Sequence, residues 1–172
     1  MTPLIRRIQP DDWQRMRARR LHALADSPMA FGSTLAHERT FTDDAWRERA
    51  ARASTGDIAA VFVAEREGQW VGTVTGYVRP DDPDNADPLI VAMFVDRSAR
   101  GAGVGAALIE AVCGWARAWG ASRITLWVPA GNQPAERLYG RCGFRPTGND
   151  RPHTHTPTLD EREMVRELGG FA

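Results

Sequence analysis

A glycine-rich segment in the middle of the chain is the feature of the sequence that points most directly to chemistry. Gly101, Gly103 and Gly105 stand at alternate positions between an apolar stretch and an amphipathic one. Glycines at this spacing let the backbone approach a ligand without Cβ clashes. The free N–H groups of a helix that begins here would face an anion, and Arg100 adds a positive charge. The segment therefore predicts a pyrophosphate-binding loop.

Two other phosphate ligands fit this segment less well. The pattern Gly101-x-Gly103-x-x-Ala106 formally matches a dinucleotide fingerprint. That fingerprint requires an acidic residue at the end of the next strand, and the stretch Leu126–Pro129 has none. A nucleoside-triphosphate loop would need Gly-Lys-Ser/Thr, which the segment lacks. The alternative without any ligand is a flexible glycine-rich turn.

The elements around this loop can be predicted from hydrophobic periodicity. Leu89–Val95 is a continuous apolar run, typical of a strand buried on both faces. After the loop, an amphipathic helix is expected to run to about Trp119. Ser122–Val128 is predicted to be a second buried strand. Asn132 is expected to cap a helix that continues through Cys142.

The remaining pattern indicates helices first and antiparallel strands afterwards. A strand is expected over Leu4–Gln9, followed by a helix that ends near Ser27 and a second helix that Thr42 caps. Four further strands are predicted, at Ile58–Arg66, Gln69–Arg79, Phe144–Thr147 and Glu163–Leu168. Together these elements predict a mixed α/β (α+β) fold, with one domain over residues 1–172.

Composition excludes several classes of protein. The chain has 172 residues, of which 22 are Lys or Arg and 22 are Asp or Glu, so its net charge is +0. This balance argues against nucleic-acid or anionic-membrane binding driven by bulk charge. No apolar run reaches the ~18 residues of a transmembrane helix. Cys113 and Cys142 lack metal-site spacing, and His153-x-His155 has too few partners, so we expect a cytoplasmic protein without a metal.

Two motifs, in order, resemble those of the GNAT superfamily of N-acetyltransferases. Arg100-x-x-Gly103-x-Gly105 looks like the family's motif for the pyrophosphate of acetyl-CoA. The second motif consists of Asn132, Ala135, Leu138, Tyr139, Gly143 and Phe144 at the family's spacing. The resemblance spans the chain and is most specific between Leu89 and Phe144. It implies a strongly twisted sheet of mixed antiparallel and parallel strands, with helices on both faces.

The resemblance also implies how acetyl-CoA is bound. The strand at Leu89–Val95 would splay from the strand at Ile124–Val128, and the pantetheine arm would lie in the gap. Backbone groups of Phe94 and Val95 would bond the pantetheine and polarise the thioester carbonyl. Asn132 would contact the pantetheine, cap its own helix, or do both. The pyrophosphate would accept hydrogen bonds from the backbone of Arg100, Gly101, Ala102, Gly103, Val104, Gly105 and Ala106, which we call the phosphate loop.

Tyr139 is the expected general acid, and it would also contact the coenzyme. A phenol with a pKa near 10 is reasonably matched to a leaving thiolate with a pKa of roughly 8.5. Helical spacing places Ala135, Leu138 and Cys142 on a core face, with Tyr139 one residue off it and facing a cleft. The structural alternative is that Tyr139 only anchors its helix. A buried structural role is expected for Cys142, rather than that of an acyl-carrying nucleophile.

The general base is less well defined by the sequence. Many GNAT proteins place a glutamate on the strand that matches Leu89–Val95, whereas this strand is wholly apolar. Glu38 is the base that we select, with His37, His153, His155 and water chains as alternatives.

Three segments are expected to surround the acceptor, namely Pro28–Phe41, Asp81–Asp87 and Arg151–Thr158. The expected activity is direct transfer of acetyl from acetyl-CoA to a primary amine of a small molecule, in a ternary complex. The alternatives are a protein N-terminus or lysine as the acceptor, and a noncatalytic CoA-binding module. A small acceptor favours a covered cleft, and a peptide favours an open groove. A homodimer is possible.

Overall fold

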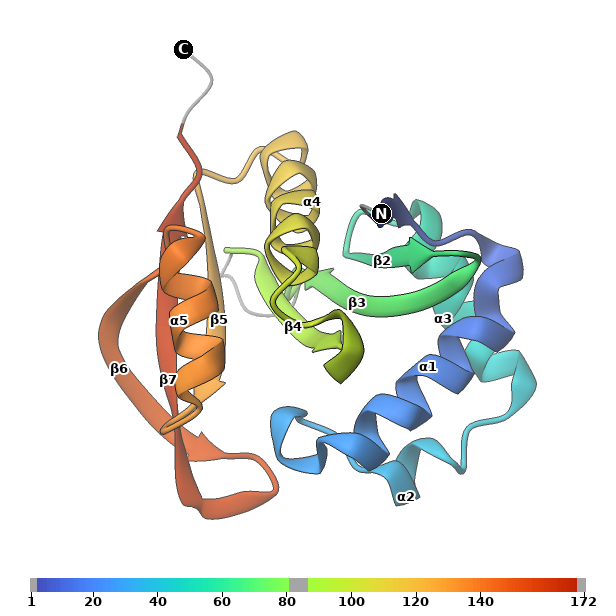
Figure 1. The fold of residues 1–172 in the computed structure, drawn as a ribbon, viewed down its shortest axis with the longest axis horizontal. Coiled ribbons are helices and arrows are strands. Elements are labelled where there is room, and N and C mark those ends of the chain that lie inside the picture. The colour runs from blue at the N-terminus through green and yellow to red at the C-terminus, as the bar shows by residue number, and fades with distance from the viewer. Residues whose placement is uncertain (1–2, 81–86, 170–172) are drawn as a thin grey trace.

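The computed structural model describes residues 3–80 and 87–169, which form one sheet with helices on both sides (Figure 1). Its strands are β1 (Leu4–Arg7), β2 (Ala59–Arg66), β3 (Gln69–Tyr77), β4 (Leu89–Val95), β5 (Arg123–Pro129), β6 (Arg145–His153) and β7 (Thr156–Glu167). Its α-helices are α1 (Trp13–Asp26), α2 (Leu35–Glu38), α3 (Asp43–Thr55), α4 (Val104–Ala118) and α5 (Gln133–Arg141).

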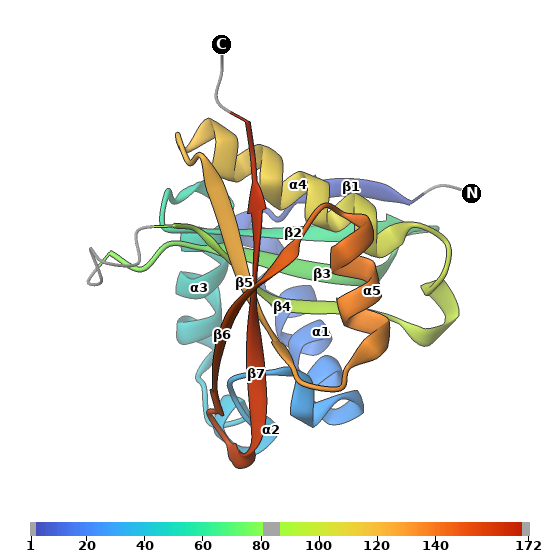
Figure 2. The ribbon, with the colours of Figure 1, turned by 90° about the vertical axis from the view of Figure 1, so that its left-hand side faces the viewer.

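The seven strands follow the order β1-β2-β3-β4-β5-β7-β6. Every neighbouring pair is antiparallel except β4 and β5, which run parallel. Figure 2 shows β5, β7 and β6 crossing the direction of β2, β3 and β4 steeply, with α4 on one side of these central strands and α1 and α3 on the other. The predicted twisted, mixed sheet with helices on both faces is therefore confirmed.

The sheet opens where β4 meets β5. These strands pair only through Leu89 with Thr125 and Ile90 with Leu126, and they then diverge. A bulge lies at the same point, because Thr75 pairs with Val91 whereas Thr73 pairs with Phe94. Within the bulge, Ala92 has a φ of 53°, a left-handed conformation that is rare for residues other than glycine. The bulge therefore ends the pairing and creates the predicted gap between the two strands.

The core divides between the two faces of the sheet. Helix α4 packs Val104, Leu108 and Val112 into the larger cluster, at the helical spacing expected from the sequence. On the other face, Trp46 of α3 is fully buried with Ile8 and other apolar residues. These two layers hold the central strands, and with them the gap between β4 and β5, in place.

Two predictions about strands were wrong. The strands predicted at Phe144–Thr147 and Glu163–Leu168 are longer in the structure, where β6 and β7 take in most of Arg151–Thr158 and pair with each other. The proline and charged residues of this segment lack the period-2 alternation from which strands are predicted. Strand β4 is not buried on both faces: Val91 is 39% exposed, because the gap beside it leaves one face open.

Candidate active site

The phosphate loop presents unpaired backbone N–H groups at the start of α4. The first hydrogen bond of this helix runs from the Ala107 N–H to the Gly103 carbonyl, at 3.0 Å. The N–H groups of Val104, Gly105 and Ala106 come before that bond, so the helix itself cannot satisfy them. Gly103 caps the helix with a φ of 79°, which glycine adopts at little cost. This end of α4 is thus an anion site of the predicted kind.

Arg100 is fixed beside this loop. Its Nε donates a hydrogen bond of 2.9 Å to the Val95 carbonyl, and its Nη2 lies 3.8 Å from Oδ2 of Asp26. Arg97 also pairs with Asp26, at 3.3 Å. Ser27 donates a hydrogen bond to Asp26 and, with the two arginines, lowers the pKa of this carboxyl group. The Val95 carbonyl, predicted to contact pantetheine, is therefore already an acceptor for Arg100.

A cavity of about 1350 Å³ extends from the phosphate loop into the gap between β4 and β5. We call it the donor cavity. Gly105 lies so close to α5 that a Cβ at this position would come within 2.9 Å of Leu138 Cδ2. Most of the residues predicted to bind the coenzyme line this cavity, namely Phe94, Val95, Arg100, Gly101, Gly103, Gly105, Ala106, Asn132 and Tyr139. Asn132 also caps α5 by accepting a hydrogen bond of 3.3 Å from the Ala135 N–H.

Helix α5 turns both its predicted core face and Tyr139 to the core. Tyr139 is only 8% exposed and belongs to the larger core cluster, whereas Ala135 and Leu138 are half-buried beside it. All three residues and Cys142 line the donor cavity, because the gap between the strands exposes one flank of the helix. The expected separation of a core face from a cleft face was therefore wrong.

Tyr139 combines burial with access to the donor cavity. Its ring packs edge-on against Phe144, with 5.9 Å between centroids. Burial raises the pKa of Tyr139 above its ordinary value. The phenol is consequently protonated at neutral pH and can donate a proton, although its raised pKa makes it a weaker acid than a free tyrosine.

A second cavity, of about 960 Å³, lies on the other side of β4. Residues of α1, α2, α3, β2, β3 and β7 line it, and we call it the acceptor cavity. The two cavities share Ala30, Ile90, Val91, Ala92 and Trp127. They therefore meet at the bulge in β4, where Val91 is exposed. The part of Asp81–Asp87 at residues 81–86 lies outside the described residues.

Glu38 sits in the wall of the acceptor cavity, 2% exposed. It accepts three hydrogen bonds from Arg20, of 2.7, 3.0 and 3.0 Å, and one of 3.3 Å from Arg49. Burial favours the neutral acid, but the hydrogen bonds and charges of the two arginines outweigh it and lower the pKa of Glu38. A carboxylate held in this way is a weak base.

The histidine alternatives occupy three different settings. His37 is exposed at the acceptor cavity, with its ring edge-on to Phe41. His153 is buried, and its Nε2 lies 3.9 Å from Oε1 of Glu161. Glu161 is 8% exposed, lines the acceptor cavity and accepts a hydrogen bond of 2.9 Å from Arg151. Sequence reasoning missed Glu161, because its strand was predicted to begin two residues later.

His155 joins the tip of the β6–β7 hairpin to the segment after α1. Its Nε2–H donates to the Gly32 carbonyl at 2.8 Å, and the Thr156 hydroxyl contacts the Met29 sulfur at 3.7 Å. Figure 1 shows the hairpin tip meeting this segment beneath the gap in the sheet. The groove between the first helices and the late strands is thus bridged rather than open.

Other reactive groups are buried. Cys113 and Cys142 are both free and buried, and burial raises the pKa of Cys113 to about 11, which disfavours the reactive thiolate.

Within residues 3–80 and 87–169, no three His, Cys, Asp or Glu side chains are grouped to hold a metal ion. In the same residues, no helix has the length and apolar character needed to cross a bilayer.

Comparison with known proteins agrees with this geometry. Residues 18–144 match the sequence profile of the acetyltransferase (GNAT) family. An uncharacterized N-acetyltransferase of Mycobacterium tuberculosis is 30% identical over 120 residues, which cover 70% of this chain and 74% of that protein. A mycothiol acetyltransferase of Thermomonospora curvata is 32% identical over 132 residues, 77% of this chain but only 39% of that protein.

Solved structures share the fold. A GNAT acetyltransferase of Streptococcus pneumoniae superposes with a TM-score of 0.79 at 22% identity, over 96% of this chain and 99% of that one. A putative acetyltransferase of Salmonella typhimurium, solved with acetyl-CoA, gives 0.77 at 22% identity, over 100% and 97% of the chains. The chain therefore belongs to the GNAT family and is an acetyltransferase that uses acetyl-CoA.

Proposed function

We propose that this enzyme acetylates the primary amine of a small molecule, with acetyl-CoA and the acceptor bound at the same time. The observation that carries this proposal is the bridge from His155 to Gly32, because it covers the groove that a peptide would need. The shared lining at Ala92 and Val91 supports direct transfer, since an amine in the acceptor cavity can reach a thioester in the donor cavity.

The donor cavity suits acetyl-CoA by its chemistry. Unpaired N–H groups of the phosphate loop and the nearby Arg100 complement a pyrophosphate. The gap between β4 and β5 offers unpaired strand edges to an extended pantetheine arm. When bound there, acetyl-CoA supplies the acetyl group, and the chain's own residues orient it.

We assign the proton donor to Tyr139, which lines the donor cavity. For the proton acceptor, we propose Glu161 in place of Glu38. Among the described residues, Glu38 accepts four hydrogen bonds from arginines and Glu161 accepts one. Oε1 of Glu161 lies 3.9 Å from Nε2 of the buried His153. Glu161→Gln is expected to lower kcat/KM by about 10²–10⁴-fold. An unchanged kcat/KM in the folded variant would exclude this role.

CoA release from acetyl-CoA in the presence of candidate acceptors tests the function. The panel contains amino acids, polyamines, aminoglycosides and peptides with free N-termini or lysines. Turnover of small amines at least tenfold faster than peptides supports the proposal. Faster turnover of peptides would favour the protein-acceptor alternative. Tight binding of acetyl-CoA with no turnover of any amine would indicate a noncatalytic module.

A further inference from the structure

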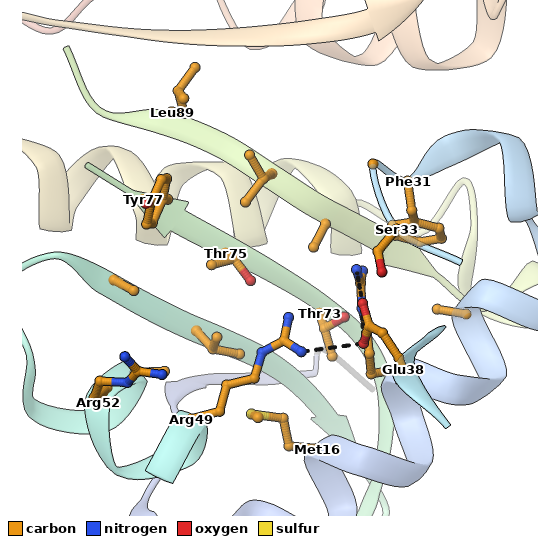
Figure 3. A pocket seen from close by; sticks show the side chains of 18 of the residues that line it. Met16, Phe31, Ser33, Glu38, Arg49, Arg52, Thr73, Thr75, Tyr77 and Leu89 are labelled. Carbon is orange, nitrogen blue, oxygen red and sulfur yellow. Dashed lines mark hydrogen bonds and ion pairs between the residues drawn. The ribbon is translucent and has the colours of Figure 1, made fainter. Parts of the chain in front are cut away.

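Three charged side chains meet in one wall of the acceptor cavity. Arg20 comes from α1, Glu38 from α2 and Arg49 from α3, and Figure 3 shows Arg49 reaching across the cavity to Glu38. Their hydrogen bonds measure 2.7 to 3.3 Å. Two guanidinium groups share one carboxylate, so this arginine cluster carries one uncompensated positive charge.

Donors of the arginine cluster remain unused. Glu38 occupies Nε and Nη2 of Arg20 and Nη1 of Arg49. Nη1 of Arg20 is buried and has no hydrogen-bond partner in the part of the chain that the structure describes. Buried donors of this kind gain most from a ligand that accepts a hydrogen bond. Thr73 and Ser33 also line the cavity near the cluster (Figure 3).

The other charges around the acceptor cavity leave this excess uncompensated. Arg151 pairs with Glu161 at 2.9 Å, and Arg52 pairs with Glu48 at 3.9 Å. Burial lowers the pKa of Arg7, and the negative charge of Asp57, which also lines the cavity, partly offsets this effect. Each of these acids thus faces a base of its own, and the arginine cluster is where an anion would be attracted.

Aromatic rings hold both arginines in place. The guanidinium of Arg20 lies over Phe31 at 4.8 Å, and that of Arg49 lies over Trp46 at 5.2 Å. Burial lowers the pKa of Arg49, and Glu38 only partly offsets this effect. A guanidinium that is already ordered loses little freedom when it binds a carboxylate through its fork of donors.

We propose that the arginine cluster binds a carboxylate of the acceptor, so that the substrate is an amine that also carries a carboxylate, as amino acids do. This inference rests on the proposed function, because it takes the acceptor cavity as the site of the amine. With the carboxylate held at the helices, the amine points to the bulge at Ala92, where the donor cavity begins. Glu38 positions the two arginines and takes no part in the chemistry.

Binding can be measured without turnover. Calorimetric titration of the CoA-loaded protein would compare each common L-amino acid with its own carboxamide. For at least one pair, we expect the carboxylate to bind about 10- to 100-fold more tightly, the range of one charge-assisted contact. Arg49→Gln should abolish this preference, and Arg49→Lys should retain part of it. Arg47→Gln, on the same helix but exposed outside the cavity and paired with Asp44, is the matched control and should leave the preference intact.

The outcomes separate this inference from the proposed function. Equal binding of carboxylates and carboxamides, or a preference that survives Arg49→Gln in a folded variant, would overturn the carboxylate site. Rapid acetylation of polyamines without binding of any amino acid would overturn it too, while the proposed function would stand. Conversely, Arg49-dependent binding of carboxylates without turnover of any amine would uphold the site and defeat the proposed function.

Discussion

The donor side of the cleft is formed mainly by backbone groups, and the acceptor side is formed mainly by side chains. On the donor side, backbone N–H groups and glycine conformations of one continuous stretch, β4 to α5, form the site. On the acceptor side, the side chains come from four separate elements, the first three helices and the distant strand β7, namely Arg20, Glu38, Arg49 and Glu161. A backbone site leaves a short motif in the sequence, because only certain residues permit its geometry. A side-chain site assembled by folding leaves none.

This difference predicts two classes of variant. Changes on the donor side should reduce activity with every acceptor by the same factor. Changes on the acceptor side should alter the choice among acceptors and leave the affinity for acetyl-CoA intact. A variant on one side that changed both the affinity for acetyl-CoA and the choice among acceptors would show that the two cavities are coupled more closely than their shared lining suggests.

The largest effect is expected for Tyr139→Phe. Removal of the proton donor should lower kcat by about 10²–10⁴-fold for all amines, with the Kd for acetyl-CoA unchanged. Steady-state kinetics and calorimetry measure the two quantities. Trp119→Phe changes an aromatic residue that is 42% exposed and lines neither cavity, and it should leave kcat within about twofold. Full activity in Tyr139→Phe would refute its role as the acid.

The second-largest effect, a loss of affinity for acetyl-CoA, is expected for Gly103→Asp. An aspartate at a φ of 79° is strained, and its charge would repel the pyrophosphate at the start of α4. We expect acetyl-CoA to bind on the order of 100-fold more weakly. Gly114→Asp places the same charge on an exposed position of the same helix, and its Kd should match the wild type. Equal affinities of the two variants would exclude the phosphate loop as the binding site.

The sequence predicted the donor side in detail for physical reasons. Strand β4, helix α4 and the cap at Asn132 all follow from local periodicity and capping rules. The splay of β4 from β5 came from the family resemblance, because its cause, the bulge at Ala92, shows no signal in an apolar run.

The acceptor side could be predicted only in part. Glu38 lies at the cavity, as expected, but the sequence does not show that Arg20 and Arg49 hold it from two other helices. Glu161 was missed because β7 has few apolar residues, and it forms by pairing with β5 and β6. Local rules cannot predict the pairing with β5, since these two strands are brought together by the tertiary fold.

Glu38→Gln should reduce stability and change its dependence on pH. The variant loses a buried charge-assisted network, at a cost of about 1–3 kcal/mol in the free energy of unfolding at pH 7. Because folding lowers the pKa of Glu38 below its ordinary value of 4.5, its contribution is complete above that pH and declines as the pH falls further. Urea unfolding should therefore show the difference from wild type narrowing in acid.

The matched control for this prediction is Glu48→Gln. Glu48 lines the same cavity but is largely exposed and pairs with Arg52 at 3.9 Å. Its loss should change the stability by less than about 0.5 kcal/mol. If Glu38→Gln were equally mild at pH 7, the arginine cluster would not depend on its carboxylate.

The smallest effect is expected at the bridge over the cleft. His155→Ala removes one exposed hydrogen bond to Gly32, worth about 0.5–1.5 kcal/mol, so the hairpin tip should spend more time away from the segment after α1. We expect KM for small acceptors to rise about two- to tenfold and the Kd for acetyl-CoA to stay constant. Acetylation of peptides, measured by CoA release, should increase because the groove opens. His155→Gln keeps an N–H donor at this position and should show smaller changes. Unaltered selectivity between peptides and small amines in His155→Ala would mean that another feature, and not this bridge, excludes large acceptors.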